Sequence, residues 1–423
     1  MGIQADNKTF KSYLFFWVGQ VFSIFGSSVV FFVLIWWITD TTVDPIAISI
    51  AVFSYFIPMI IFSPIAGIVA DRYDRKKVIL LVDSLQAFST VILTFFFIFS
   101  LIKFWIILLF IVIRSICQAF HGPNANAVIP TMVPKEHLSR INGINAFFTS
   151  FVNVIGPIVG GFLLLFFTVG QALWIDVITF FISLVPLLLI DIPRVKKRGE
   201  THGSESFMDS FKEGLSIIRN ITGLLSMMIV FMILNFLHQP VGTLLALFIK
   251  ADHGGTVLHF SLISMTLNIG TLLGGFLTTV KKNWKHKIRV IYLAYIFASI
   301  GQILLATTPV GNFPLLMIYS AMGGFTIPII NSLYFTIIHL KVPHDKVGRV
   351  VSIDTTLSFI AMPLGTLIAG PLAIALGTPP LFLICSVLTI YTITLMYLLS
   401  NIRALDTVKE VESGINIISN GDP

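Results

Sequence analysis

Long apolar runs recur along the whole chain and are separated by short polar breaks. Each run is about 20 residues long, which as a helix is enough to cross a hydrocarbon layer of ~30 Å. The runs are apolar on every face, as in VILTFFFIFSLI (91–102), whereas the strands of a membrane barrel alternate apolar and polar residues. Charged residues make up only 11% of the 423 positions, against roughly 25% in a soluble domain. The sequence therefore predicts an all-α integral membrane protein that crosses the lipid bilayer several times.

Twelve membrane-spanning helices are expected, six on each side of the longest polar break. Their predicted limits are 13–38, 45–70, 78–101, 104–121, 141–167, 172–190, 222–248, 257–280, 288–307, 314–338, 350–376 and 380–400. The predicted domains are an N-terminal six-helix half (1–191), a cytoplasmic linker with a short amphipathic helix on the membrane surface (192–220), a C-terminal six-helix half (221–401) and a cytoplasmic tail (402–423).

Lysine and arginine are distributed very unevenly across this topology. All but three of the 27 lie in segments that would share one face of the membrane, the exceptions being Lys103, Arg114 and Lys250. Because positive charges concentrate in cytoplasmic loops, we expect both termini in the cytoplasm and the chain in the plasma (inner) membrane. The same bias accounts for the net charge of +7, so no nucleic-acid partner is expected.

The two halves of the chain repeat one another. The segment RSICQAFHGP (114–123) aligns with YSAMGGFTIP (319–328), and VPKEHLSR (133–140) aligns with VPHDKVGR (342–349). Two such halves in the same orientation are related by an axis along the membrane normal, which is the architecture of the major facilitator fold. A substrate site is then expected between the halves, near the middle of the membrane.

A charged segment, GIVADRYDRKKV (67–78), follows the second predicted span. It resembles the G-x-x-x-D-R-x-x-R-K-K loop of the major facilitator superfamily, with matching residues Gly67, Asp71, Arg72, Arg75, Lys76 and Lys77. The cations also serve as topology signals. The resemblance implies that Asp71 docks on the start of the eleventh span, near 348–351, where free N–H groups attract an anion, and latches the halves in an outward-open state.

Ionisable residues inside membrane spans are costly and mark functional positions. Arg114 lies a little more than half-way down the fourth span, with Gln118 one turn below it. The alternative, without a role in transport, is that the side chain of Arg114 extends toward the lipid headgroups. The fourth-span motif of the family, R-x-x-Q-G, also contains an arginine tied to proton exchange, but here the glutamine comes one residue later.

Three acids are also expected to be at least half-buried, namely Asp83, Asp176 and Asp354. The repeat aligns Asp354 with Asn145, so we interpret Asp354 as an acid retained for its proton. The candidates for proton coupling or gating are Arg114, Asp354 and Asp83, whereas a structural hydrogen bond is favoured for Asp176. Two alternatives remain open: Asp354 pairs with Arg349 or Arg75 as part of the latch, and Asp83 pairs with the cytoplasmic bases.

Spans one, four, seven and ten are expected to line the substrate cavity, together with Asn145. Phe, Trp and Met surround their polar residues, which are Gln20, Ser23, Gln118, Asn235, His238, Gln239, Asn331 and Tyr334. A large apolar pocket with few polar anchors suits bulky lipophilic molecules better than sugars or phosphates. Hydrogen bonds between helices are the alternative role for these side chains, above all for His238.

The segment GPIVGG (156–161) places small residues four apart beside a proline. Gly156 and Gly160 allow two helices to approach closely, and Pro157 can bend the span. Together with Gly161, these residues resemble the G-P-x-x-G-G motif of the family's fifth span, which is associated with antiporters.

Four longer segments resemble the macrolide-efflux branch of the drug–proton antiporters. They are residues 110–134, 173–177, 211–219 and 348–370. The resemblance implies export of a small hydrophobic, macrolide-like or multidrug-like compound in exchange for protons by alternating access, with the proton gradient in place of a cofactor. An uncoupled or lipid-type transporter and an exporter of an endogenous metabolite remain alternatives. We expect a monomer that is not an enzyme and binds no metal, because the histidines are scattered and no nucleotide loop is present.

Overall fold

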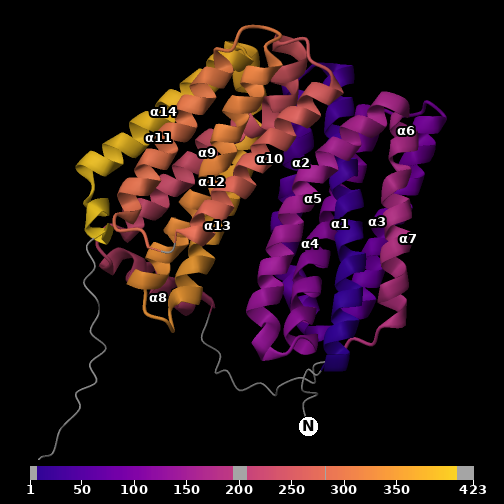
Figure 1. Ribbon diagram of the computed structural model, residues 1–423, viewed down its shortest axis with the longest axis horizontal. Coiled ribbons are helices and arrows are strands. Elements are labelled where there is room, and N and C mark those ends of the chain that lie inside the picture. Colours follow the sequence, from indigo (N-terminus) through magenta and orange to yellow (C-terminus); the bar gives the residue numbers. More distant parts are fainter. Residues whose placement is uncertain (1–6, 194–206, 282, 407–423) are drawn as a thin grey trace, which may run out of the picture.

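The computed structural model describes residues 7–193, 207–281 and 283–406, and within these ranges twelve helices are long and apolar enough to cross a membrane (Figure 1). The first half contains α1 (Asn7–Thr42), α2 (Pro45–Arg72), α3 (Arg75–Ile98), α4 (Phe104–Met132), α5 (Leu138–Phe166), α6 (Val169–Ala172) and α7 (Trp174–Leu189). The rest contains α8 (Phe207–Asn220), α9 (Leu224–Leu247), α10 (Val257–Val280), α11 (Lys287–Ala306), α12 (Phe313–Lys341), α13 (Val347–Leu376) and α14 (Thr378–Leu399). The predicted fold class is confirmed.

Short helical turns complete the chain at three places. Lys135–His137 (η1) and Asn401–Asp406 (η3) are 3-10 helices, and Phe248–Asp252 (η2) is a π-helical extension of α9. Part of the predicted linker (194–206) and most of the predicted tail (407–423) lie outside the described residues. The described start of that tail packs against the C-terminal half, because Ile402 and Leu405 of η3 are buried.

Several helices extend beyond their predicted limits, most clearly α4. The prediction ended this span at 121, before Pro123 and Asn124, yet α4 continues to Met132 with Pro123 and Pro130 inside it. Asn124 is fully buried and donates to the carbonyl of Phe120 one turn earlier. Prolines are tolerated inside membrane helices because neighbouring groups satisfy the freed backbone.

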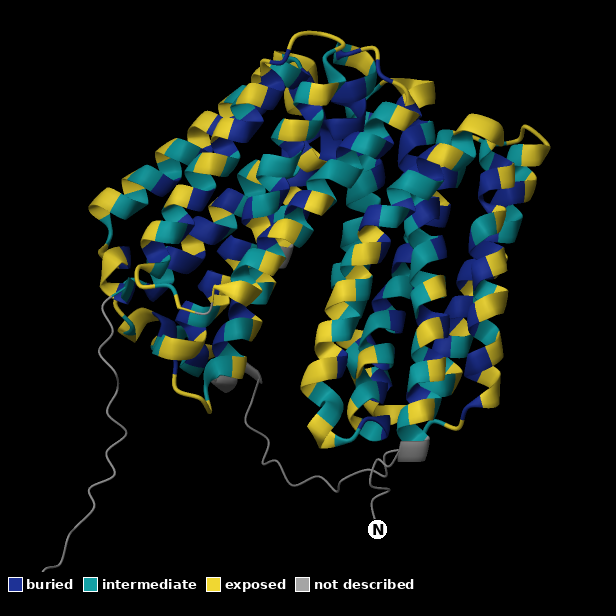
Figure 2. Ribbon diagram, in the orientation of Figure 1, coloured by how far each residue is buried: buried dark blue, intermediate teal, exposed yellow. Residues whose placement is uncertain are grey.

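The outer surface of both bundles is apolar. Figure 2 shows exposed residues along the outer sides of the helices. Phe181, Phe276 and Leu398 are among the large apolar side chains that are more than half exposed. Large apolar side chains on this scale are exposed at the surface of a soluble protein only at a cost. They are the expected neighbours of lipid chains.

The two faces of the bundle differ, and we name them by the segments they carry. The basic face carries the start of α1, the α2–α3 and α4–α5 turns, α8 and η3, whereas the opposite face carries the α1–α2, α3–α4 and α13–α14 turns. Figure 1 shows the two bundles converging toward the opposite face and diverging toward the basic face.

Close contacts between the halves lie near the opposite face. A Cβ atom on Gly370 of α13 would lie 2.7 Å from the carbonyl oxygen of Pro45 at the start of α2. The hydroxyl of Ser261 in α10 donates to the carbonyl of Pro157 in α5 at 2.8 Å, beside Gly161. Asp40 and Lys250 form an ion pair of 2.5 Å between the ends of α1 and α9. The pairs α2–α13 and α5–α10 therefore close this face.

Within the C-terminal half, α10 and α12 approach each other through glycines. A Cβ atom on Gly270, Gly274 or Gly324 would overlap a backbone oxygen of the facing helix. Backbone cannot rotate away as a flexible side chain can, so this contact requires glycine. The neighbouring Gly323 has nothing within 4 Å of an added Cβ atom.

The Gly324→Ala variant should therefore be destabilised by about 1–3 kcal/mol, the usual cost of overpacking. Gly323→Ala is the matched control, because it changes helix propensity in the same way without the overlap. Thermal unfolding of both variants in detergent checks this. Equal melting temperatures for the two would contradict the proposed backbone contact.

Candidate substrate cavity and buried charges

A cavity of about 460 Å³ lies between the two halves, below the closed face. Its aromatic walls come from α1, α2 and α10, and its polar groups include Gln239 of α9 and Asn268 of α10. The main contributors are Phe31, Tyr55, Phe56, Phe260, Gln239 and Asn268. The cavity is therefore largely apolar with a few hydrogen-bonding groups, as a site for a lipophilic molecule requires.

A second cavity of about 270 Å³ extends from this one into the N-terminal half. The two cavities share Ser28, Phe31, Tyr55 and Asn153 on their walls. At its inner end the second cavity reaches Arg114 and, a turn away, Gln118. A buried guanidinium group is thus in contact with the space between the halves.

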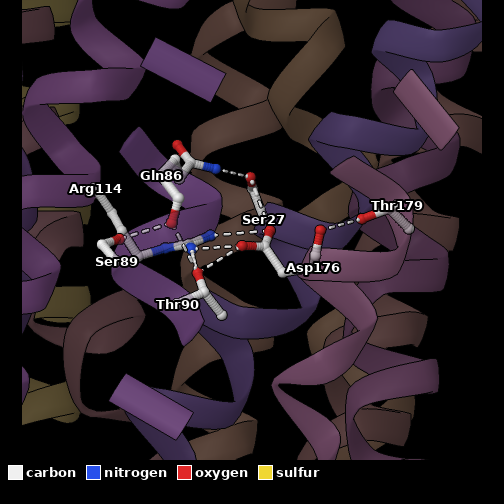
Figure 3. A network of polar contacts seen from close by, with 7 residues as sticks. All are labelled: Ser27, Gln86, Ser89, Thr90, Arg114, Asp176 and Thr179. Atoms are coloured by element: carbon white, nitrogen blue, oxygen red, sulfur yellow. Dashed lines mark hydrogen bonds and ion pairs between the residues drawn. The ribbon is translucent and has the colours of Figure 1, made fainter. Parts of the chain in front are cut away.

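Arg114 is held by Asp176 of α7 rather than by lipid headgroups (Figure 3). Its Nη1 atom lies 2.7 Å from Asp176 Oδ2, and its Nη2 atom lies 3.3 Å from Asp176 Oδ1. Thr90 of α3 donates to Asp176 Oδ2 at 2.7 Å and accepts from Arg114. Because this pair is buried and bidentate, it is a strong charge-assisted contact.

Ser27 of α1 extends the same network toward α3. It donates to Asp176 Oδ1 at 3.5 Å and accepts from the amide of Gln86. Close packing of α1 on α7 makes this possible, since an added Cβ atom on Gly26 would lie 3.0 Å from Cα of Asp176. Four helices therefore meet at one buried ion pair.

Asp354 lies in the other half, on α13, and has a different environment. The hydroxyl of Tyr334 in α12 donates to Asp354 Oδ1, and the Tyr334 ring stacks on Phe231 with centroids 3.8 Å apart. Arg75 donates instead to the carbonyl of Ala127 at 2.7 Å. The alternative in which Asp354 pairs with Arg75 does not fit this structure.

Arg349, the other proposed partner of Asp354, forms an ion pair with a different residue. The predicted position of Tyr334 in the substrate cavity is also wrong. Arg349 pairs with Glu213 of α8, as does Lys346 beside it. Tyr334 was expected to line the substrate cavity, but it is 3% exposed and faces Asp354. An apolar span gives no periodic signal to show which side of the helix faces the cavity.

Asp83 of α3 lies beside a histidine instead of the bases at the membrane surface. Its Oδ1 atom is 3.6 Å from His121 Nε2 on α4, and the same ring nitrogen is 2.6 Å from Gln20 Oε1 on α1. His121 was not among the predicted site residues. The sequence did contain a signal for His121, because it lies seven residues, or two helical turns, after Arg114 and therefore on the same face of the helix.

The predicted glycine motif lies where α5 meets two other helices. Added Cβ atoms on Gly156 and Gly160 would contact Ser28 and Phe32 of α1, and one on Gly161 would contact Ser261 of α10. Pro157 contributes to the wall of the cavity between the halves. The motif thus permits close packing of α5 on both halves.

The charged loop is fastened to its own half in this conformation. Lys76 donates to the carbonyls of Leu188 and Ile190 at 3.0 and 2.5 Å, and Asp74 caps α3 by accepting from the Lys76 amide at 3.1 Å. Gly67 and Arg72 lie in the last part of α2, Lys77 lies in the first turn of α3, and Asp71 is exposed. The start of α13 is held by Glu213 instead of Asp71. The expected docking of Asp71 near 348–351 is not made here, because the halves diverge at the basic face (Figure 1).

Twelve membrane helices in two halves, with a cavity between the halves, are the features expected of one transporter family. Comparison with known sequences identifies that family. The sequence model of the Major Facilitator Superfamily matches residues 16–365 and 242–418. The chain belongs to the Major Facilitator Superfamily. Its family and structural neighbours are transporters, which points away from an enzyme.

Among relatives of this major facilitator, macrolide efflux protein A of Streptococcus pyogenes is 26% identical over 390 residues, which cover 92% of this chain and 96% of the relative. Macrolide efflux protein A of Enterococcus faecalis is 27% identical and covers 73% of this chain and 96% of its own length. Multidrug efflux pump Tap of Mycobacterium tuberculosis (strain ATCC 25618 / H37Rv) is 24% identical over 86% of this chain and 87% of the pump. The predicted resemblance to the macrolide-efflux branch is confirmed.

Solved structures support the major facilitator fold. The nucleoside transporter NupG matches with a TM-score of 0.70 and 15% identity, covering 94% of this chain and 100% of that one. The D-xylose-proton symporter matches with a TM-score of 0.68 and 13% identity over the same shares of the two chains. At these identities the likeness concerns the fold alone.

The polar residues predicted to share one cavity are distributed over several. Gln20 and Asn145 line a hollow of about 110 Å³ in the N-terminal half, and Asn235, His238 and Asn331 line one of about 210 Å³ in the C-terminal half. His238 Nδ1 lies 2.6 Å from the amide of Gln302, so it is part of a hydrogen bond between helices. Ser23 is partly exposed and is not on the wall of any cavity described here.

The expected set of lining helices therefore requires correction for this major facilitator. The cavity between the halves is walled by α1 and α9, the predicted first and seventh spans, together with α2, α5 and α10. The predicted fourth span, α4, lines the extension of this cavity and the smaller hollow within the N-terminal half, and the predicted tenth span, α12, lines the hollow in the C-terminal half. Contact of α2 with α13 and of α5 with α10 at the opposite face brings these helices over the cavity. The prediction did not consider that the set of lining helices depends on which end of the two halves is closed.

Asp176→Asn should destabilise the protein by about 3–5 kcal/mol, because it leaves Arg114 as a buried cation without its carboxylate partner. The double variant Arg114→Gln, Asp176→Asn removes both charges and should recover part of the loss. Thermal unfolding in detergent measures both. A single variant as stable as the unmodified protein would contradict the structural importance of this pair.

Proposed function

We propose that this major facilitator exports a hydrophobic or amphipathic, macrolide-like compound in exchange for protons by alternating access. The observation that carries the proposal is the aromatic cavity between the halves, which continues to the buried Arg114–Asp176 pair. Efflux relatives at 24–27% identity support the same class of cargo. We further propose that the protein works as a monomer in the plasma membrane with both termini in the cytoplasm.

In this proposal the basic face is cytoplasmic, following the distribution of lysine and arginine. The conformation described here is then closed to the outside. The ion pair of Asp40 and Lys250 closes it together with stacked rings, since Phe260 of α10 lies 4.9 Å from Phe32 and 5.8 Å from Trp36 of α1, centroid to centroid. A lipophilic compound would enter the cavity from the cytoplasm or the inner leaflet.

The opposite state requires the halves to close at the basic face and open at the other. Asp71 would then reach the start of α13 near 348–351, in place of its exposed position here. Three buried sites are available to link this movement to protons: Arg114 with Asp176, Asp83 with His121, and Asp354 with Tyr334. Charged groups buried in a membrane protein are costly, which makes each a candidate for coupling.

The direct test uses purified protein in proteoliposomes with an imposed proton gradient. Erythromycin, a panel of lipophilic cations and lipids are added in turn, while proton flux and substrate flux are recorded together. Proton movement that depends on one class of compound is the expected result. Substrate flux without proton movement would contradict antiport and favour an uncoupled transporter.

Fixing the closed face should stop transport. With Cys117 and Cys385 replaced by serine, Asp40→Cys and Lys250→Cys provide the only thiols, one on each half. A cleavable bifunctional thiol reagent should abolish efflux from the double variant, and reduction should restore it. The two single-cysteine variants control for the effect of the reagent. Unchanged efflux from the cross-linked protein would contradict alternating access at this face.

A further inference from the structure

Polar residues of the N-terminal half are arranged in two layers. Three helices each contribute two of them at a spacing of seven residues: Gln20 and Ser27 on α1, Asp83 and Thr90 on α3, and His121 and Arg114 on α4. The layer of Ser27, Thr90 and Arg114 is the network around Asp176 (Figure 3). The second layer lies two turns, or about 10 Å, closer to the basic face.

The second layer is as deeply buried as the first. Gln20, Asp83 and His121 are 4%, 6% and 4% exposed. His121 Nε2 lies 2.6 Å from Gln20 Oε1 and 3.6 Å from Asp83 Oδ1, so one ring nitrogen faces both oxygens. An amide oxygen only accepts, and in this geometry Nε2 carries the hydrogen and Nδ1 holds a lone pair.

The two layers differ in how well their hydrogen bonds are satisfied. Both carboxylate oxygens of Asp176 and both terminal nitrogens of Arg114 have a close partner, whereas Asp83 Oδ2, His121 Nδ1 and Gln20 Nε2 bond no group in the part of the chain that the structure describes. Buried polar atoms without partners are rare and require an explanation. Here two of the three, Asp83 Oδ2 and His121 Nδ1, can each accept a proton.

Other titratable groups nearby do not supply a compensating charge. From α4 they are Arg114 and Cys117, from α7 Asp176, and from α1 Tyr13; α6 contributes none. Arg114 and Asp176 neutralise each other at 2.7 Å. The Asp83–His121 pair therefore carries a charge of −1 without an added proton and none with one.

The pair is connected to the side of the protein that is open here. A hollow of about 110 Å³ is lined by Gln20 and His121, and also by Asn126 and Thr149, which are exposed. This volume is sufficient for several water molecules, since each needs about 10–15 Å³. A proton released at His121 thus has a route through this hollow, past Asn126 and Thr149, toward the basic face.

We propose that Asp83 and His121 together form the proton-binding site of this transporter, with Gln20 as a positioning residue. The inference rests on the proposed antiport and names the residues that carry its proton. One proton from outside converts the pair from −1 to neutral, and the same proton leaves toward the cytoplasm in the conformation described here.

The coupling follows from the cost of a buried charge. When both faces are closed, no water stabilises an uncompensated carboxylate, and the negative pair is strongly disfavoured. The transporter without substrate can therefore return through this occluded state only when the pair holds a proton, whereas in the loaded transporter the free energy of substrate binding has to offset the cost of the negative pair. Gln20 connects the pair to α1, whose Ser28 and Phe31 line the substrate cavity.

The test measures proton release from purified protein in detergent, with a pH-sensitive dye, when substrate is added. The unmodified protein and Asp83→Glu should release protons, whereas Asp83→Asn and His121→Gln should release none. Substrate affinity of the unmodified protein should weaken by up to about tenfold per pH unit on acidification if one proton is displaced, and should be independent of pH in Asp83→Asn.

Two controls separate coupling from folding. Thr94→Val changes another fully buried polar side chain of α3, whose hydroxyl bonds no described group, and should keep proton release. Substrate counterflow in Asp83→Asn, which needs no net proton movement, should continue. Proton release that persists in Asp83→Asn would overturn this site while leaving antiport intact. Substrate transport by the unmodified protein without any proton release would instead overturn antiport, and this site with it.

Discussion

Inside a hydrocarbon layer every polar group must find its partner within the protein, because water is not available there. Helices meet this requirement for the backbone, and the Arg114–Asp176 pair shows how side chains meet it. Arg114 comes from α4, Asp176 from α7, Thr90 from α3 and Ser27 from α1, so satisfying one guanidinium fixes four helices. The architecture of the N-terminal half follows from this requirement.

The two halves repeat in sequence but differ in their buried chemistry. In the N-terminal half, two layers of ionisable groups lie between the helices. In the C-terminal half, α10 and α12 approach through Gly270, Gly274 and Gly324, and the buried acid Asp354 bonds a tyrosine instead of a cation. One half is thus built around charges and the other around backbone contact, even though the fold of each is similar.

The sequence was sufficient to predict the twelve spans, the two halves and a charged side chain, Arg114, within the fourth span. Apolar runs have the length of a membrane, and a charge within such a run is conspicuous. The partners were not predictable in the same way. Asp176 is 62 residues from Arg114, and His121 is the last residue of the predicted fourth span, whereas α4 continues to Met132. Tyr334 was assigned to the wrong side because an apolar helix has no amphipathic pattern to orient it.

Two kinds of interaction, an ion pair and stacked aromatic rings, close the opposite face. The side chains of Asp40 and Lys250 are 48% and 34% exposed. Their ion pair therefore contributes about 0–1 kcal/mol to the stability of the closure, and ions in the medium weaken it. The stacked rings of Phe32, Trp36 and Phe260 are insensitive to salt. A rise in ionic strength at the opposite face therefore weakens the Asp40–Lys250 pair but not the packing of the stacked rings. The balance between conformations therefore acquires a modest dependence on the salt content of the surrounding fluid.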